Sequence, residues 1–252
     1  MSHRWCEFFY PRVDSTMDRA RELAPQVPAQ TAAFAVRTGH QFHGRGRRGN
    51  RWYQEPGSAL LMTLAIRRGG RWDPQDPLPS TMALRTAAAV YTALQGHPVS
   101  HPLRIKWPND ILLGGHKLCG ILLEATPGWF FAGIGLNLRV PTSVPCTVDD
   151  LAPTGLYGVL PPDCARLWYH RVSRELGCHL SGDRWRKTVQ AALAWREAQV
   201  EVRTADSVLL GTISGIDPQG GLLLKDPQTG VLLPPVFSGT VRLNGASSSA
   251  AT

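Results

Sequence analysis

A nine-residue segment, residues 44–52 (GRGRRGNRW), combines residue types that are suited to closing over an anion. Glycine lets a backbone approach a ligand closely and adopt positive φ angles. Arginine presents a planar fork of donors that matches carboxylate and phosphate oxygens. We therefore expect this segment, called here the glycine/arginine loop, to cover an anionic small molecule. The alternative is an exposed, solvated arginine loop, for which tryptophan and glycine are poor choices.

Two further segments, residues 106–110 (KWPND) and 117–122 (KLCGIL), carry other reactive side chains. In the first, an ammonium, an amide and a carboxylate flank a proline, which forces the chain to turn. In the second, Lys117 begins an apolar strand, and Gly120 permits a ligand or another backbone to come close. An alternative role for Asn109 and Asp110 is to satisfy backbone groups at a strand corner. If the fold brings the three segments together, the chain is an enzyme.

The glycine/arginine loop also matches the pattern G-x-G-x-x-G of dinucleotide-binding proteins. A true dinucleotide motif opens an amphipathic helix. Residues 50–57 (NRWYQEPG) have no apolar helical stripe and end in Pro-Gly. No Lys-Ser or Lys-Thr follows at the spacing of a P-loop either. We therefore predict neither a Rossmann site nor a P-loop.

Composition sets broad limits. The chain has 252 residues, 43% of them hydrophobic, enough for one substantial domain and a small one. The net charge of +8 is spread along the chain apart from the loop, and no nucleic-acid-binding motif is visible. The five cysteines are scattered, without zinc-ligand spacing. Without a membrane-spanning run or a secretory signal, the expected location is the cytoplasm.

Hydrophobic periodicity and turn residues predict an α+β protein. Asp14, Ser15 and Thr16 are candidate caps for a short helix, and the alanine-rich residues 80–94 form the clearest helical pattern. The predicted strands cover residues 5–10, 31–36, 58–67, 103–107, 110–113, 116–125 and 130–138, and the predicted helices cover 17–24, 80–94, 164–180 and 184–198. From residue 199 onward, short strands alternate with Gly, Pro and Asp turns, which suggests a small appended barrel. The expected division is therefore residues 1–198, 199–244 and a disordered tail, 245–252.

The order of five motifs resembles that of biotin protein ligases. They are Ser15-Thr16, the glycine/arginine loop, KWPND, residues 117–124 (KLCGILLE) and residues 133–137 (GIGLN). The resemblance implies a mixed β-sheet with packed helices, like class II aminoacyl-tRNA synthetases, followed by a small SH3-like barrel. It also implies a monofunctional enzyme without the N-terminal DNA-binding domain that some members carry.

The implied reaction has two steps. The carboxylate of biotin attacks the α-phosphate of ATP to give biotinyl-5′-AMP and pyrophosphate. A lysine of a biotin carboxyl carrier protein or domain, part of an acyl-CoA carboxylase, then attacks the mixed anhydride and releases AMP. Mg²⁺ would help to neutralise the gathered charge. The resemblance implies no DNA and no membrane partner, and it leaves a homodimer open.

The resemblance also implies roles for individual residues. The expected biotin-binding residues are Ser15, Thr16, Gln41, Arg45, Gly46, Arg47, Lys117 and Gly120. The expected ATP- or adenylate-binding residues are Arg48, Trp52, Lys106, Asn109 and Asn137. The expected catalytic residues are Arg45, Arg47, Lys117 and Asp110, with Asp110 also the candidate metal ligand.

Two positions depart from the family pattern. Met17 stands where the family usually has Asn, and Gln54-Glu55-Pro56 replaces the usual Ser-Pro behind the tryptophan. The competing functions are a lipoate or octanoate ligase or transferase of the same fold, a basic nucleic-acid-binding protein, and a biotin sensor without ligase activity.

Overall fold

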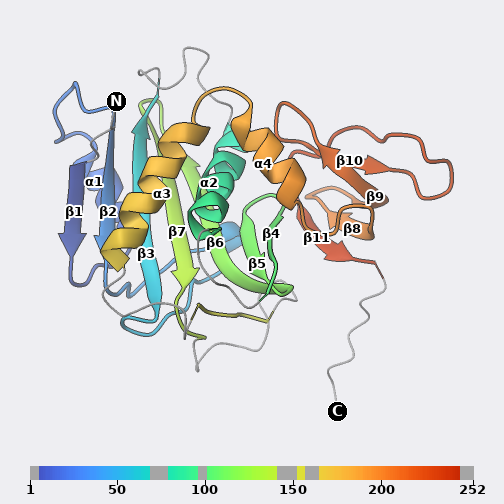
Figure 1. Cartoon of the computed structure of the whole chain (residues 1–252). Coiled ribbons are helices and arrows are strands. Elements are labelled where there is room, and N and C mark those ends of the chain that lie inside the picture. The colour runs from blue at the N-terminus through green and yellow to red at the C-terminus, as the bar shows by residue number, and fades with distance from the viewer. Residues whose placement is uncertain (1–5, 69–78, 96–100, 141–151, 157–164, 245–252) are drawn as a thin grey trace.

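The computed structural model describes residues 6–68, 79–95, 101–140, 152–156 and 165–244 (Figure 1). Its largest element is a seven-stranded sheet in the order β1-β2-β3-β7-β6-β5-β4. β1 runs parallel to β2, and all other neighbours are antiparallel. The strands are β1 (Cys6–Tyr10), β2 (Ala33–Thr38), β3 (Ala59–Arg67), β4 (Leu103–Lys106), β5 (Asp110–Leu113), β6 (His116–Ala125) and β7 (Trp129–Asn137).

Helices cover both faces of this sheet. On one face lie α2 (Pro79–Leu94), α3 (Ala165–His179) and α4 (Arg184–Ala192), whereas α1 (Thr16–Leu23) packs on the other (Figure 1). The interior strand β3 is therefore buried on both faces. This burial explains why its sequence lacks the apolar–polar alternation of a half-exposed strand. Among the described residues, no helix is long and apolar enough to cross a membrane.

One helix ends earlier than the sequence predicted. The last helix was expected to reach residue 198, but α4 ends at Ala192. Trp195 and Glu197 then adopt φ angles of 58° and 62°, a left-handed conformation that a helix cannot contain. The chain turns there into the second sheet. The predicted tail, residues 245–252, lies outside the described residues.

The C-terminal strands form a four-stranded sheet in the order β10-β9-β8-β11. They are β8 (Gln199–Arg203), β9 (Val208–Ile216), β10 (Leu222–Lys225) and β11 (Thr240–Leu243). A closed barrel is not confirmed, because the described edge strands β10 and β11 do not pair with each other. Among the short strands expected after residue 199 was the apolar run 231–233, which contributes only an isolated bridge from Leu232 to Lys225. Pro234 and Pro235 follow directly, and without N–H groups they cannot extend a ladder.

The small sheet docks against the β4–β5 corner of the large one. The buried indole Nε1 of Trp107 donates to the Gly220 carbonyl at 3.0 Å. The Gln190 side chain on α4 accepts from the Ile216 amide at 2.9 Å. The first of these bonds places the β9–β10 turn close to the KWPND motif.

A buried histidine links helices α2 and α3. His179 is fully buried, and its Nε2 lies 3.2 Å from the Thr92 hydroxyl. Burial, followed by the positive charge of Arg184, lowers the pKa of His179 from 6.5 to about 4. The neighbouring Arg85, also buried, donates to the carbonyl oxygens of His179 and Leu180 at the end of α3.

We expect this histidine to make the fold sensitive to acid. Between pH 6.5 and 4 the unfolded chain binds a proton at His179 that the folded chain excludes, so stability falls as pH falls through this window. The expected loss is roughly 2–3 kcal/mol. His179→Gln should reduce the difference between urea unfolding free energies at pH 7 and pH 4.5. The exposed His170→Gln is the matched control, and equal pH dependence in both variants would refute the assignment.

Candidate active site

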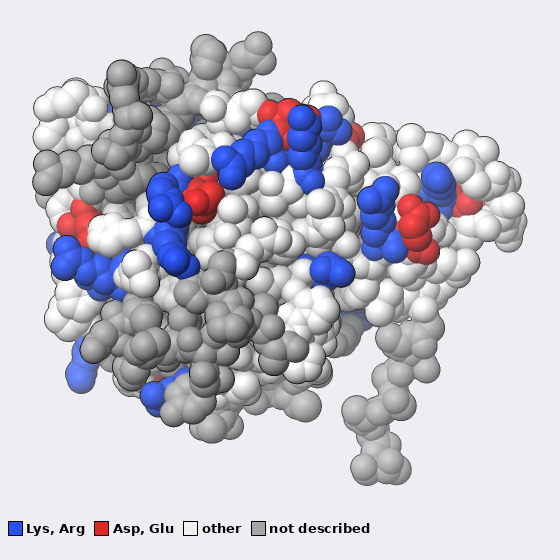
Figure 2. Space-filling view, in the orientation of Figure 1, with Lys and Arg blue, Asp and Glu red and all other residues white. Residues whose placement is uncertain are grey.

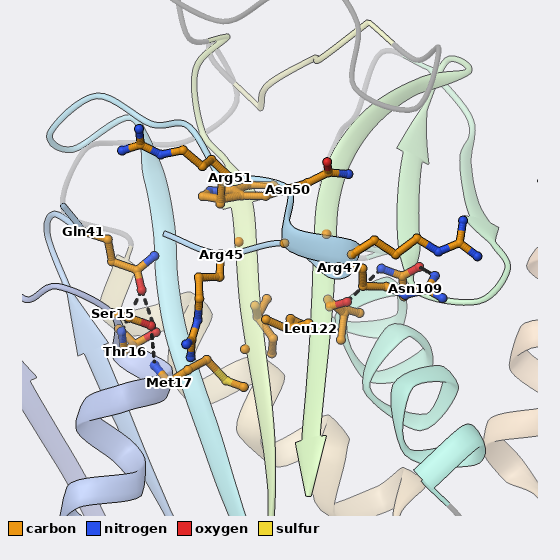
Figure 3. A pocket seen from close by; sticks show the side chains of 18 of the residues that line it. Ser15, Thr16, Met17, Gln41, Arg45, Arg47, Asn50, Arg51, Asn109 and Leu122 are labelled. Atoms are coloured by element: carbon orange, nitrogen blue, oxygen red, sulfur yellow. Dashed lines mark hydrogen bonds between the residues drawn. The ribbon is translucent and has the colours of Figure 1, made fainter. Parts of the chain in front are cut away.

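A pocket opens beneath the glycine/arginine loop, with about 810 Å³ of empty space including the open solvent at its mouth (Figure 3). Its walls come from the start of α1, the loop, β6, β7 and one residue of β11. The fold therefore brings together the three segments that the sequence singled out. The lining residues include Ser15, Thr16, Met17, Gln41, Arg45, Gly46, Arg47, Arg48, Asn50, Arg51, Trp52, Asn109, Lys117, Gly120, Ile121, Leu122, Gly133, Ile134, Gly135 and Thr240.

One end of the pocket is polar. Ser15 caps α1, and its hydroxyl accepts from the Met17 amide at 3.2 Å. The backbone amide and the hydroxyl of Thr16 both donate to Gln41 Oε1, at 2.7 and 3.0 Å, and Thr63 donates to the Thr16 hydroxyl at 2.9 Å. The Gln41 amide nitrogen has no hydrogen-bond partner within the described part of the chain. A ligand with both donors and acceptors would find partners here.

The indole of Trp52 lies on a platform of two glycines. Gly120 on β6 and Gly135 on β7 are register partners. A Cβ at Gly120 would come within 2.8 Å of the indole, and one at Gly135 within 2.4 Å. Both positions therefore require glycine for the indole to lie flat on the sheet. The indole Nε1 is buried without a hydrogen-bond partner in the described residues.

The glycine/arginine loop is a tight hairpin and does not open a helix. The Trp52 amide donates to the Gly44 carbonyl at 2.9 Å, and the Gly46 amide donates to the Asn50 carbonyl at 2.7 Å. Only a short 3₁₀ turn, Arg47–Gly49, lies between them. The loop therefore lacks the helix that a dinucleotide-binding motif would open, as the sequence predicted. Arg48 has a φ of 56°, a strained conformation for a non-glycine residue.

Two hydrogen bonds fix the loop to distant parts of the chain. Arg47 Nη1 donates to Asn109 Oδ1 at 2.8 Å, and Asn109 Nδ2 donates to the Ile121 carbonyl at 2.8 Å. The loop is thus joined to the KWPND corner and to β6. Arg48 Nη1 donates to the Thr240 hydroxyl of β11 at 2.9 Å. Thr240 is a pocket residue that the sequence did not reveal, because no local pattern connects positions 192 apart.

Lys117 points its charge into the site from β6. Its Nζ lies 3.0 Å from Asp110 Oδ1, and the two side chains are 13% and 6% exposed. Such a shielded pair is only weakly screened by water. Asn137 supports the same strand through a 3.5 Å contact from its Nδ2 to the Lys117 carbonyl. Burial raises the pKa of the neighbouring Cys119 thiol, so this cysteine stays protonated and is no nucleophile.

Not every predicted site residue lines the pocket. Asp110 and Asn137 lie behind Lys117, and both are buried. Lys106 is also buried, with its ammonium 5.3 Å from the centre of the Trp195 ring. The other predicted residues all line the pocket. Sequence reasoning missed the apolar wall, which consists of Leu122, Gly133, Ile134 and Gly135 together with Met17.

The described residues contain no group of three or more His, Cys, Asp or Glu side chains that could hold a metal ion. Mg²⁺ commonly binds through one or two carboxylates together with substrate phosphates. Asp110 offers one such carboxylate, which is buried outside the pocket lining, 3.0 Å from Lys117 Nζ, and does not form a complete metal cage.

The sequence model of the biotin/lipoate A/B protein ligase family matches residues 9–140. The biotin–[acetyl-CoA-carboxylase] ligase of Paracoccus denitrificans is 32% identical in an alignment that covers 88% of this chain and 95% of the relative. This chain belongs to the biotin protein ligase family. The bifunctional ligase/repressor BirA of Bacillus subtilis is 29% identical over 86% of this chain and 68% of its own length.

The fold of this family member also matches solved structures. A biotin protein ligase from Aquifex aeolicus, in complex with biotin and ATP, superimposes with a TM-score of 0.74. The superposition covers 95% of this chain and 98% of the other, at 22% sequence identity. At this identity the match supports the mixed α+β fold, and the roles of residues still depend on the geometry of the pocket.

In this biotin protein ligase family member, the first loop arginine is held by two carboxylates at the pocket mouth. Arg45 Nη2 lies 2.9 Å from Asp18 Oδ1 and 3.5 Å from Glu124 Oε1. Arg21 pairs with the same two carboxylates. Figure 3 shows the Arg45 side chain turned down beside Met17, toward α1. Asp18 and Glu124 therefore anchor the start of the loop to α1 and β6.

We expect Asp18→Asn/Glu124→Gln to loosen the loop in the ligand-free protein. Each of these partly exposed pairs contributes little alone, but together they hold one end of a short, arginine-rich segment. Trypsin should therefore cut the loop several-fold faster in the double variant, as measured by mass spectrometry of the first fragments. Glu22→Gln, which breaks the exposed Arg19–Glu22 pair on the same helix, is the control. Unchanged cleavage in the double variant would contradict the anchoring role.

Proposed function

We propose that this chain is an ATP-dependent ligase that activates biotin as biotinyl-5′-AMP and transfers it to a lysine of a biotin carboxyl carrier protein or domain. One observation carries the proposal. A single pocket combines a hydrogen-bonding end, a cluster of cations and a tryptophan lying on a glycine platform. The names of the relatives support the same reaction, since the proteins from Paracoccus denitrificans and Mycobacterium tuberculosis are biotin–[acetyl-CoA-carboxylase] ligases.

The polar end suits the urea ring of biotin. A cyclic urea has one carbonyl acceptor and two N–H donors. The hydroxyls of Ser15 and Thr16 and the free amide nitrogen of Gln41 offer both kinds of partner. The valeryl chain then runs beneath Arg45 and Gly46 toward Lys117 and Arg47, where the carboxylate would lie. Gly120, on which the Trp52 indole lies, lines this path beside Lys117.

In the first step, a carboxylate oxygen of biotin attacks the α-phosphorus of ATP. The bond from this phosphorus to the bridging oxygen breaks, and pyrophosphate leaves. The carboxylate and the triphosphate repel each other, so fixed cations must offset their charge. Lys117 and Arg47 are assigned to the reacting oxygens, and Arg48 to the departing phosphates. Trp52 and Asn109 are assigned to the adenylate, with Lys106 and Asn137 supporting the nucleotide side.

In the second step, the amine of the acceptor lysine attacks the acyl carbon of the mixed anhydride. The bond from this carbon to the AMP oxygen breaks, an amide forms, and the amine loses a proton. Asp110, close to Lys117, is assigned to the incoming lysine at this stage. In the first step Asp110 would also hold Mg²⁺, which would neutralise charge on the triphosphate. The loop protects the anhydride from water, because it covers the pocket.

We further propose the cytoplasm as the site of action, a catalytic domain over residues 1–198 and an accessory domain over residues 199–244. The large sheet is assigned to the class II synthetase-like architecture and the small one to an SH3-like type. A carboxylase carrier domain is the proposed partner, and homodimer formation is left to measurement. On the face shown in Figure 2, which carries α2, α3 and α4, acidic and uncharged residues separate the basic side chains.

The decisive test is biotin-dependent exchange of labelled pyrophosphate into ATP, with purified protein and Mg²⁺. We expect exchange with biotin and not with lipoate or octanoate. The family model includes lipoate ligases, so these two acids are the necessary comparison. Exchange with lipoate or octanoate alone would establish the alternative ligase. No exchange with any of the three acids would refute a ligase and favour a sensor.

A further inference from the structure

Met17 forms the apolar floor of the pocket directly beside its polar end. The side chain is 4% exposed, although the residue lines the pocket. A Cβ at Gly133 would lie 2.9 Å from the Met17 sulfur and 3.1 Å from its Cγ. The thioether therefore lies against bare backbone of β7. In Figure 3 the Met17 side chain runs beneath Arg45 toward β7, with Leu122 nearby.

The register of the sheet determines which side chains lie on either side of Gly133 at this end of the pocket. Gly133 pairs with Thr63 on β3 and with Leu122 on β6. Thr63 donates to Thr16 at 2.9 Å and so belongs to the polar side. On the other side of Gly133, the side chains of Met17 on α1 and Leu122 on β6 present only carbon atoms and the thioether sulfur. A ligand held here meets hydrogen-bonding groups along one edge and none along the other.

Biotin has the matching asymmetry. Its urea lies on one edge of a fused bicycle, and the ring thioether lies on the opposite edge. If the urea takes the hydrogen bonds of Ser15, Thr16 and Gln41, the ring sulfur faces the apolar side. A thioether needs no hydrogen bond and packs well against methionine. The nearest cation, Arg45, is already paired with Asp18 and Glu124.

We propose that Met17 is a specificity-determining residue that selects the reduced, thioether form of biotin over its ring sulfoxide. The inference rests on the proposed function and adds to it the oxidation state of the substrate. A sulfoxide oxygen is a strong acceptor, and burying it against Met17 and Leu122 leaves it without a donor. The expected preference of the wild-type protein for biotin over the sulfoxide is roughly 10- to 100-fold.

The test compares kcat/KM in pyrophosphate exchange for biotin and biotin sulfoxide in three variants. Met17→Gln keeps the length of the side chain and adds an amide donor, whereas Met17→Leu keeps the floor apolar. We expect Met17→Leu to retain the wild-type preference and Met17→Gln to reduce it about tenfold or more. Met17→Asn, which restores the usual family residue, is a second polar variant. Thermal unfolding identifies any variant that does not fold.

The possible outcomes distinguish a failure of the proposed ligase function from a failure of the role proposed for Met17. A wild-type protein that neither binds nor activates biotin would overturn the proposed function and this inference with it. Normal activation of biotin, with the same preference in wild type, Met17→Gln and Met17→Leu, would overturn the inference alone. Calorimetric titration of both ligands provides a second readout that does not depend on turnover, and the preference should shift there in the same direction.

Discussion

Lys117→Gln is expected to slow formation of the adenylate by roughly 10²- to 10³-fold, the usual cost of removing one preorganised charge-stabilising group. The ammonium enters the pocket from β6 and is largely shielded from water. It can therefore stabilise charge that develops where biotin and ATP react. The measurement is single-turnover formation of biotinyl-5′-AMP at saturating biotin and ATP.

The choice of glutamine keeps the experiment interpretable. Lys117→Ala would leave the buried Asp110 carboxylate without a partner, which commonly costs about 3–5 kcal/mol of stability. A glutamine amide still reaches toward that carboxylate as a donor. Asp110→Asn is the companion variant, since it keeps Lys117 and removes only the negative charge. A Lys117→Gln protein that unfolds normally and forms the adenylate at the wild-type rate would exclude Lys117 from the chemistry.

Gly135→Val is expected to reduce kcat/KM for ATP by about 10- to 100-fold, the size of effect that loss of one aromatic stacking contact with a base produces. Valine suits a β-strand, so β7 itself should persist. Its side chain would nevertheless occupy the place of the Trp52 indole, which lies 2.4 Å from a Cβ at this position. Trp52 would be lifted from its platform. Steady-state kinetics with varied ATP measures the effect.

A double-mutant cycle shows whether the effect passes through Trp52. If it does, Trp52→Ala/Gly135→Val should be no slower than Trp52→Ala alone. Additive losses would mean that valine damages the pocket in another way. Gly128→Ala is the control for adding a side chain to a glycine of the same sheet region, because no atom lies within 4 Å of a Cβ there.

The sequence predicted the parts of this protein that depend on local patterns. Turn residues and hydrophobic periodicity located every strand of the large sheet to within a few residues. The expected helix cap at Ser15 is confirmed by its hydrogen bond to the Met17 amide. The three motifs do converge on one pocket, because β3, which follows the glycine/arginine loop, lies near β6 and β5 in the strand order β3-β7-β6-β5.

Other features depend on contacts between distant segments, which no local pattern encodes. KWPND looks like one functional unit, yet Asn109 faces the pocket while Lys106 packs against Trp195. The sequence also gave no sign that Gly120 and Gly135 oppose each other, because that depends on the register of β6 and β7. The small sheet stays open between β10 and β11, because the segment that pairs with the outer side of β10 around Pro234 and Pro235 makes only isolated bridges.

The hydrogen bond between Arg48 and Thr240 makes the ligand and the small sheet thermodynamically linked. Any ligand that stabilises the loop in the position described here also stabilises β11 in the position where Thr240 accepts this hydrogen bond. By reciprocity, whatever displaces β11 must weaken ligand binding by the same free energy. Amide hydrogen exchange in β11, which is far along the chain from the glycine/arginine loop, should therefore slow when a ligand fills the pocket. The exchange rate of β11 thus reports whether the pocket is occupied, although among the pocket-lining residues only Thr240 belongs to this strand.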